Sequence, residues 1–194
     1  MYEYVNDKQF LRRMRSLCGD VMQDLCHTLK VEYNIGSSFY LVGSGARNLI
    51  MQNADRPIDL DYNLKITRID DWEDCRNIKE CVRKAFNIIL SEYDWSDCED
   101  STSSLTTGKI YFPQGNDTQF SIDVCIVCED VDGNYYRLIH EKTGLFNCDK
   151  YFWNQAPNSK QLKKKADYIK NKGKWTLVRA QYKKIKNKYL TSND

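Results

Sequence analysis

The segment 58–64 alternates apolar and polar residues, and this alternation constrains the fold of the chain more than any other feature. It predicts a β-strand, because successive side chains of a strand point to opposite faces of the sheet. Asp59 and Asp61 then leave the same face, with their Cα atoms roughly 6.5–7 Å apart. A third acid, Asp123, lies alone within a second apolar segment, 120–127, which also predicts a strand.

Three acids on adjacent strands are a poor choice for stability alone. Like charges repel one another, and burial penalises each charged form. A divalent cation would neutralise them, and carboxylates are preferred ligands of Mg²⁺ and Mn²⁺. We therefore expect Asp59, Asp61 and Asp123 to form a metal site. Taken without the other features, alternating acids also occur on the solvated face of an ordinary strand.

A glycine turn precedes the acidic strand. Residues 39–42 predict a short buried strand, and Gly43, Ser44 and Gly45 follow it at the start of a short predicted helix. Free backbone N–H groups at such a position favour phosphate, although an ordinary tight turn has the same pattern. The turn lacks both the lysine of a Walker A motif and the third glycine of a dinucleotide fingerprint. Arg47 either adds positive charge to a phosphate site here or lies on the helix surface.

In combination, these features resemble the nucleotidyltransferase superfamily of the polymerase β type, which includes kanamycin nucleotidyltransferase and the minimal nucleotidyltransferases of toxin–antitoxin systems. The family pattern is a hydrophobic-Gly-Ser turn, a helical spacer, an acid-hydrophobic-acid pair and a third acid. It corresponds to 42–44, to Asp59 with Asp61, and to Asp123. The spacer is slightly longer than usual, and the resemblance covers roughly residues 39–127.

The resemblance implies an α/β (α+β) fold, with a mixed nucleotidyltransferase-type sheet flanked by helices. It also implies Mg²⁺-dependent transfer of a nucleoside monophosphate from an NTP such as ATP to a hydroxyl acceptor, with release of pyrophosphate. Two metal ions stabilise the attacking and leaving oxygens in such an in-line displacement. The implied metal-binding and catalytic residues are Asp59, Asp61 and Asp123, and the implied nucleotide-binding residues are Gly43, Ser44 and Arg47.

The sequence leaves the acceptor open: an RNA 3′ end, a second nucleotide, a protein hydroxyl or a small molecule all fit. A rival hypothesis is a catalytically inactive nucleotidyltransferase fold that serves as a binding module or a toxin–antitoxin-type partner subunit. The presence of all three acids and of the Gly-Ser turn favours the enzyme.

Charge divides the chain into two parts. Residues 160–190 hold twelve Lys or Arg and one acid, a net charge of +11, so with a total of +2 the remaining residues carry −9. Such a segment is either the solvated face of amphipathic helices or a contact surface for RNA or another polyanion. We expect a catalytic core with an N-terminal helix over 1–150 and a basic helical C-terminal lobe over 151–194.

The periodicities predict the remaining elements. The predicted helices cover 7–30, 46–53, 70–93 (capped by Asp70 or Asp71), a segment capped by Asn158 or Ser159 and ended by Gly173, and a last helix. The last helix carries a stripe that predicts core: Trp175, Val178, Tyr182, Ile185 and Tyr189. Further strands are predicted over 105–112, 119–128 and 135–140, with a loop over 94–104.

Eight irregularly spaced cysteines in 194 residues favour reduced thiols over a disulfide scaffold. No segment has the apolar length of a membrane span, and the first residues lack the features of a signal peptide. We therefore expect a cytoplasmic protein.

Overall fold

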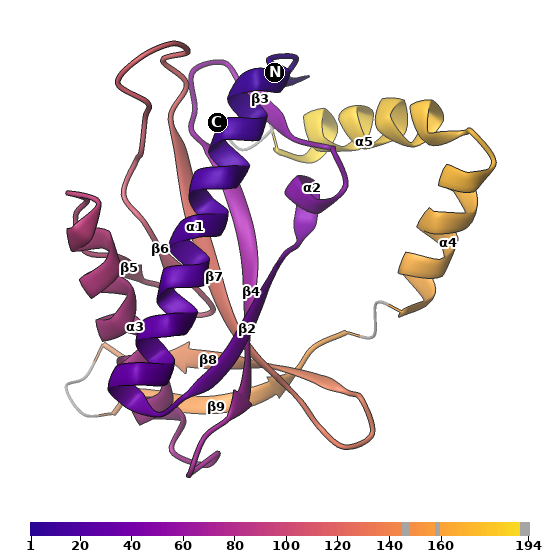
Figure 1. The fold of residues 1–194 in the computed structure, drawn as a ribbon. Coiled ribbons are helices and arrows are strands. Elements are labelled where there is room, and N and C mark those ends of the chain that lie inside the picture. The colour runs from indigo at the N-terminus through magenta and orange to yellow at the C-terminus, as the bar shows by residue number, and fades with distance from the viewer. Residues whose placement is uncertain (145–147, 158–159, 191–194) are drawn as a thin grey trace.

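The computed structural model describes residues 1–144, 148–157 and 160–190 (Figure 1). Its centre is a mixed sheet in which the described strands follow the order β2-β4-β7-β6-β5, and β8 and β9 extend it from β7. The strands of this sheet are β2 (Gly36–Leu41), β4 (Ile58–Arg68), β5 (Glu99–Asp100), β6 (Leu105–Thr106), β7 (Phe120–Glu129), β8 (Tyr135–Glu141) and β9 (Lys150–Gln155).

The two longest strands, β4 and β7, lie side by side at the middle of the sheet and pair in parallel. The other neighbouring pairs among the described strands are antiparallel. The β4–β7 register places Asp61 opposite Asp123 and Asp59 opposite Ser121. The mixed sheet and its flanking helices confirm the fold class that the sequence predicted.

Two long helices, α1 (Lys8–Tyr33) and α3 (Cys75–Glu92), cover one face of the sheet (Figure 1). The sequence offers Asn6 or Asp7 as the cap of α1, and Asp7 caps it by accepting a hydrogen bond from the backbone N–H of Phe10. The predicted cap of α3 is wrong, because Asp74 caps it instead. Asp71 accepts hydrogen bonds from the backbone N–H groups of Glu73 and Asp74, which holds this segment in a turn before the helix begins.

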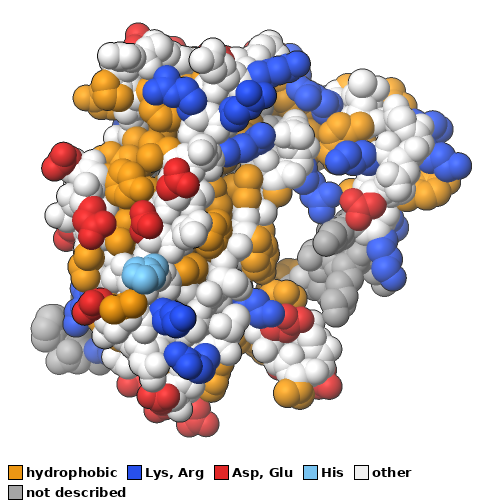
Figure 2. Space-filling view, in the orientation of Figure 1, with side chains coloured by type: hydrophobic (Ala, Val, Ile, Leu, Met, Phe, Trp, Pro, Cys, Tyr) orange, Lys and Arg blue, Asp and Glu red, His pale blue; other side chains and the backbone are white. Residues whose placement is uncertain are grey.

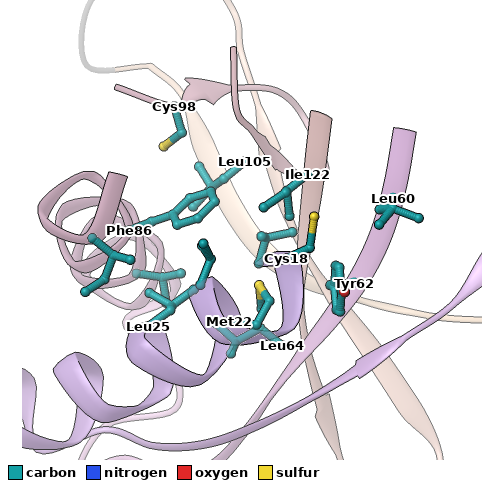
Figure 3. Packing of buried hydrophobic residues seen from close by; sticks show 14 of the residues in the cluster. Cys18, Met22, Leu25, Leu60, Tyr62, Leu64, Phe86, Cys98, Leu105 and Ile122 are labelled. Atoms are coloured by element: carbon teal, nitrogen blue, oxygen red, sulfur yellow. The ribbon is translucent and has the colours of Figure 1, made fainter. Parts of the chain in front are cut away.

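The hydrophobic core lies between these helices and the sheet (Figure 3). Leu60, Tyr62 and Leu64 of β4 point into it, and Phe86 of α3 is completely buried there. Since side chains alternate along a strand, the residues of β4 between these apolar ones lie on the opposite face of the sheet. The core therefore directs the two acids of β4 away from the helices.

The helix predicted over 46–53 is wrong. Helix α2 (Gly43–Ala46) is a single turn, and Asn48 has a positive φ of 55°, which ends the helical course of the chain. The next residues form β3 (Met51–Asn53), which pairs with β1 (Tyr2–Tyr4) in a small separate sheet. The apolar residues here are buried by this tertiary pairing, which a single segment of sequence does not reveal.

Three strand predictions need correction. The strand expected over 105–112 is reduced to β6, and Ile110 adds only an isolated bridge to Phe120. The loop expected over 94–104 contains β5, which pairs with β6. No strand was predicted for β9, which pairs with β8 along its whole length. Tyr151 and Trp153 of β9 pack against the core, so alternating aromatic residues were its sequence signal.

The C-terminal helices α4 (Lys160–Asn171) and α5 (Trp175–Leu190) form an arm beside the sheet (Figure 1). The predicted cap at 158–159 lies outside the described residues. The prediction that α5 packs into the core is wrong: none of its described residues is buried, and Ile185 and Tyr189 are 46% and 60% exposed.

The inner side of α5 contacts β1 mainly through polar groups. The backbone of Tyr2 exchanges two hydrogen bonds with the Asn187 side chain, and Lys183 pairs with Glu3. The Tyr4 hydroxyl donates to the carbonyl oxygen of Arg179. The rings of Tyr4 and Tyr2 also meet the cations of Arg179 and Lys186, so α5 packs on this short strand and contributes nothing to the core.

All eight cysteines are free thiols, as predicted. Among the described helices, none combines the length and the apolar character that crossing a membrane requires.

Candidate active site

A cleft of about 1680 Å³ lies on the face of the sheet opposite α1 and α3. Asp61 and Asp123 line its floor, and the glycine turn lines one wall. Residues of α4 and α5, including Lys170 and Arg179, line the other side, so the C-terminal arm closes one side of the cleft. Figure 2 shows the molecule hollowed between its body and this arm.

The structure places the three predicted acids on one face of the adjacent strands β4 and β7. Asp61 and Asp123 are cross-strand neighbours in register, and both are half-buried. Asp59 lies two positions earlier on the same face of β4, where it is exposed to solvent. The negative charge of Asp59 raises the pKa of both Asp61 and Asp123.

Burial is the main cause of the raised pKa values in this cluster. It raises the pKa of Asp61, and the negative charges of Asp123 and Asp59 raise it further. The positive charges of Lys186 and Arg137 act in the opposite direction. Burial also raises the pKa of Asp123, while a hydrogen bond from the Thr106 hydroxyl lowers it. The site therefore favours additional positive charge.

Two hydroxyl groups hold the acids at either end of the cluster. The Thr106 Oγ1 donates to Asp123 Oδ1 at 2.6 Å, and the Ser121 Oγ donates to Asp59 Oδ1 at 2.6 Å. Sequence reasoning did not single out either residue. Their signal was a hydroxyl residue on a strand next to an acid, and it becomes informative only once the strand register is known.

The charge of Lys186, on α5, also acts on the acids of the site. Burial lowers its pKa, and the charges of Asp59 and Asp61 act in the opposite direction. Its Nζ lies 4.5 Å from the centre of the Tyr2 ring. The sequence places Lys186 in the basic lobe but does not distinguish it from the exposed Lys184.

The glycine turn lies directly beside the acids. The backbone N–H of Val42 donates to the carbonyl oxygen of Asp61 at 2.8 Å. Gly43 has a positive φ of 60°, and a Cβ atom there would lie 2.5 Å from Asp61 Oδ2. Only glycine satisfies both conditions at this position. The turn and the acid pair thus form one site.

Of the two other predicted nucleotide-binding residues, Ser44 lies within this turn and Arg47 follows it. Arg47 lines the cleft, and this position favours a contribution of positive charge to the site over the alternative of an ordinary surface arginine. Ser44 is half-buried, and its carbonyl oxygen accepts hydrogen bonds from the backbone N–H groups of Arg47 and Leu49.

The residues present fit a magnesium ion that is bound together with a substrate. In the described part of the chain, no group of three or more His, Cys, Asp or Glu side chains is arranged to hold a metal ion by itself. Mg²⁺ is commonly bound through one or two carboxylates, with waters and substrate phosphates completing its coordination. Half-buried carboxylates with raised pKa values, beside a glycine that leaves Asp61 accessible, supply this kind of incomplete ligand set.

Solved structures of nucleotidyltransferases share this fold. One is the CD-NTase CdnG of Bradyrhizobium diazoefficiens in complex with GTP, at 13% identity and a TM-score of 0.50, covering 74% of this chain and 39% of that one. Another is the DncV cyclic AMP-GMP synthase of Vibrio cholerae in complex with nonhydrolyzable GTP, at 9% identity and a TM-score of 0.51, covering 78% of this chain and 54% of that one.

The chain therefore has the fold of the polymerase-β-type nucleotidyltransferases, as the resemblance implied, and it spans about 39% to 54% of the length of these two proteins. Comparison of the sequence with protein-family models and with curated proteins gives no match.

Proposed function

We propose that this protein is a magnesium-dependent nucleotidyltransferase, which moves a nucleoside monophosphate from an NTP to a hydroxyl acceptor and releases pyrophosphate. The observation that carries the proposal is the register of β4 and β7, which aligns Asp61 with Asp123 directly beside the Gly43 turn. In this arrangement the glycine turn and the carboxylates of Asp61 and Asp123 face the same cleft.

Each predicted residue has a role in this reaction. Asp59, Asp61 and Asp123 hold Mg²⁺, or Mn²⁺ in its place, which supplies stabilisation of negative charge on the phosphates. Asp123 also accepts the proton of the attacking hydroxyl. The turn binds the NTP phosphates through the backbone at Gly43 and Ser44, and Arg47 adds positive charge.

The size of the cleft and the basic residues in its lining support a phosphate-bearing acceptor, and the lining also holds four acids: Asp61, Asp123, Glu129 and Asp167. The cleft volume of about 1680 Å³ exceeds the roughly 300–1,000 Å³ of a typical small-molecule site, so the cleft has room for a donor and an acceptor. Arg137, Lys170 and Arg179 line it in addition to Arg47. We propose an RNA end or a second nucleotide as the acceptor, and nucleotide complexes of the proteins with the same fold agree with an NTP donor.

A second candidate function is nucleotide binding without turnover. Lys186 favours it, because its charge acts on Asp61 and Asp59 and partly neutralises them without a metal ion. In that case the protein would act as a binding module that retains the fold.

Turnover separates the two functions. The protein is incubated with each labelled NTP, Mg²⁺ and either RNA or a second nucleotide, and both the product and pyrophosphate are measured. Asp61→Asn and Asp123→Asn should each abolish product formation. Asp97→Asn, at an exposed acid away from the cleft, should leave it unchanged. Nucleotide binding by the wild type without product under any condition would support the binding module and refute the enzyme.

A further inference from the structure

We propose that Thr106 and Ser121 are positioning residues, whose hydroxyl groups orient the carboxylates of Asp123 and Asp59 for the metal ion. This inference rests on the proposed function and extends it to residues outside the family pattern. Neither hydroxyl needs to touch the ion or the substrate, because each acts through the acid to which it donates.

The register of the strands places each hydroxyl residue opposite its acid. Thr106 of β6 lies directly opposite Asp123 in the antiparallel pair β6–β7. Ser121 of β7 lies directly opposite Asp59 in the parallel pair β4–β7. Each hydroxyl thus meets its acid across adjacent strands, on the face of the sheet that carries the cleft. The Ser121 side chain is buried, with the residue only 6% exposed.

The geometry of these contacts is that of a hydroxyl bound to a carboxylate. Both distances are 2.6 Å, within the range of about 2.5–2.7 Å for a hydrogen bond from O–H to an ionised oxygen. In each case the hydroxyl binds Oδ1, and no hydrogen bond from the described residues reaches the second oxygen of the acid, which leaves that oxygen for a ligand. A carboxylate that is already held loses less conformational freedom when it binds an ion.

The neighbouring Thr107 provides a contrast within the same segment. Its Oγ1 accepts a hydrogen bond from the backbone N–H of Ile122 at 2.9 Å, and the residue is 5% exposed. This hydroxyl supports the sheet backbone and makes no hydrogen bond with an acid among the described residues. Two consecutive threonines thus have different roles, and Thr107 is a matched control for Thr106.

The test measures binding of Mn²⁺, alone and with an NTP present, by the loss of the free-ion electron paramagnetic resonance signal relative to a protein-free sample of the same composition, together with the melting temperature. Partners of metal-binding side chains typically contribute about 10–100-fold to metal affinity or activity. Thr106→Val should weaken Mn²⁺ binding by about this factor, and Thr106→Ser should restore it. Thr107→Val should lower the melting temperature but leave the Mn²⁺ affinity near that of the wild type.

Ser121→Ala tests the same idea through Asp59, and it does not depend on Thr106→Val folding correctly. It too should weaken Mn²⁺ binding at an unchanged stoichiometry. The inference is overturned if the wild type binds Mn²⁺ and both Thr106→Val and Ser121→Ala bind it equally well, or if Thr106→Ser fails to restore binding. A wild type that binds no Mn²⁺, alone or with an NTP, refutes the metal-dependent function itself and the inference with it.

Discussion

Replacing Gly43 by alanine is the sharpest test of the site, because it adds a single methyl group beside Asp61. The new Cβ would lie 2.5 Å from Asp61 Oδ2, whereas ordinary contacts begin at 3.4 Å. The carboxylate must therefore retreat by about 0.9 Å, the difference between these two distances. A misplacement of about 1 Å in a catalytic arrangement can cost about 100-fold in rate.

The cost to folding should be small in comparison. Alanine at a positive φ costs about 1–2 kcal/mol, and for a chain of this size each kcal/mol lowers the melting temperature by about 2–4 °C. The clash adds little to this, because the Asp61 carboxylate is the movable end of a side chain. Gly43→Ala should therefore lose about 100-fold in kcat/KM while its melting temperature falls by only about 2–8 °C.

Gly144→Ala is the matched control. Gly144 has a similar positive φ of 74°, but no atom of the described residues lies within 4 Å of the position that its Cβ would take. This variant should show a similar loss in melting temperature with turnover retained. Pyrophosphate release and differential scanning calorimetry on the two variants measure both quantities. Wild-type turnover in Gly43→Ala, or an equal loss of turnover in Gly144→Ala, would refute the reasoning.

Three further predictions concern charge. Asp61→Asn should abolish transfer. Without metal it should keep or raise the melting temperature, since burial and repulsion already disfavour the ionised form of Asp61. A clear loss of stability would contradict this. Because the pKa values of Asp61 and Asp123 are raised by folding, their contribution to stability is present below their unfolded pKa values and is lost as pH rises through the folded values. In urea titrations, metal-free wild type should thus lose stability with rising pH relative to a variant with both acids changed to Asn, and saturating Mg²⁺ should remove the loss. Lys186→Gln should weaken NTP binding and reduce its salt dependence more than Lys184→Gln does, because Lys186 faces the acids and Lys184 is exposed. Binding titrations at two salt concentrations measure both effects. Equal effects of the two variants would show that the basic lobe acts only as a diffuse charge.

Local sequence patterns determined the parts of the site that lie within one strand or one turn. Asp59 and Asp61 share a face because side chains alternate along a strand, and this follows from any correct strand assignment. The apolar residues between them determine which face is buried, so they also direct the acids outward. The Gly-Ser turn was recognisable for the same local reason.

Contacts between distant segments were decided only by the tertiary structure. Thr106 meets Asp123 across 17 positions of sequence, and Ser121 meets Asp59 across 62. These contacts depend on strand register, and a shift by one residue would turn each side chain to the other face of the sheet. No local pattern in either segment specifies that register.

Helix α5 also shows what the local sequence determines and what only the tertiary structure decides. Helical spacing correctly predicted that α5 forms, but its apolar stripe wrongly predicted that the helix enters the core. Where a helix packs depends on the surface that it meets, and α5 meets the short strand β1, 185 positions away at the contact between Tyr2 and Asn187. That docking is also what brings Lys186 close to Asp59 and Asp61. The periodicity of a helix is a property of its own residues, whereas its partner is chosen by the rest of the folded chain.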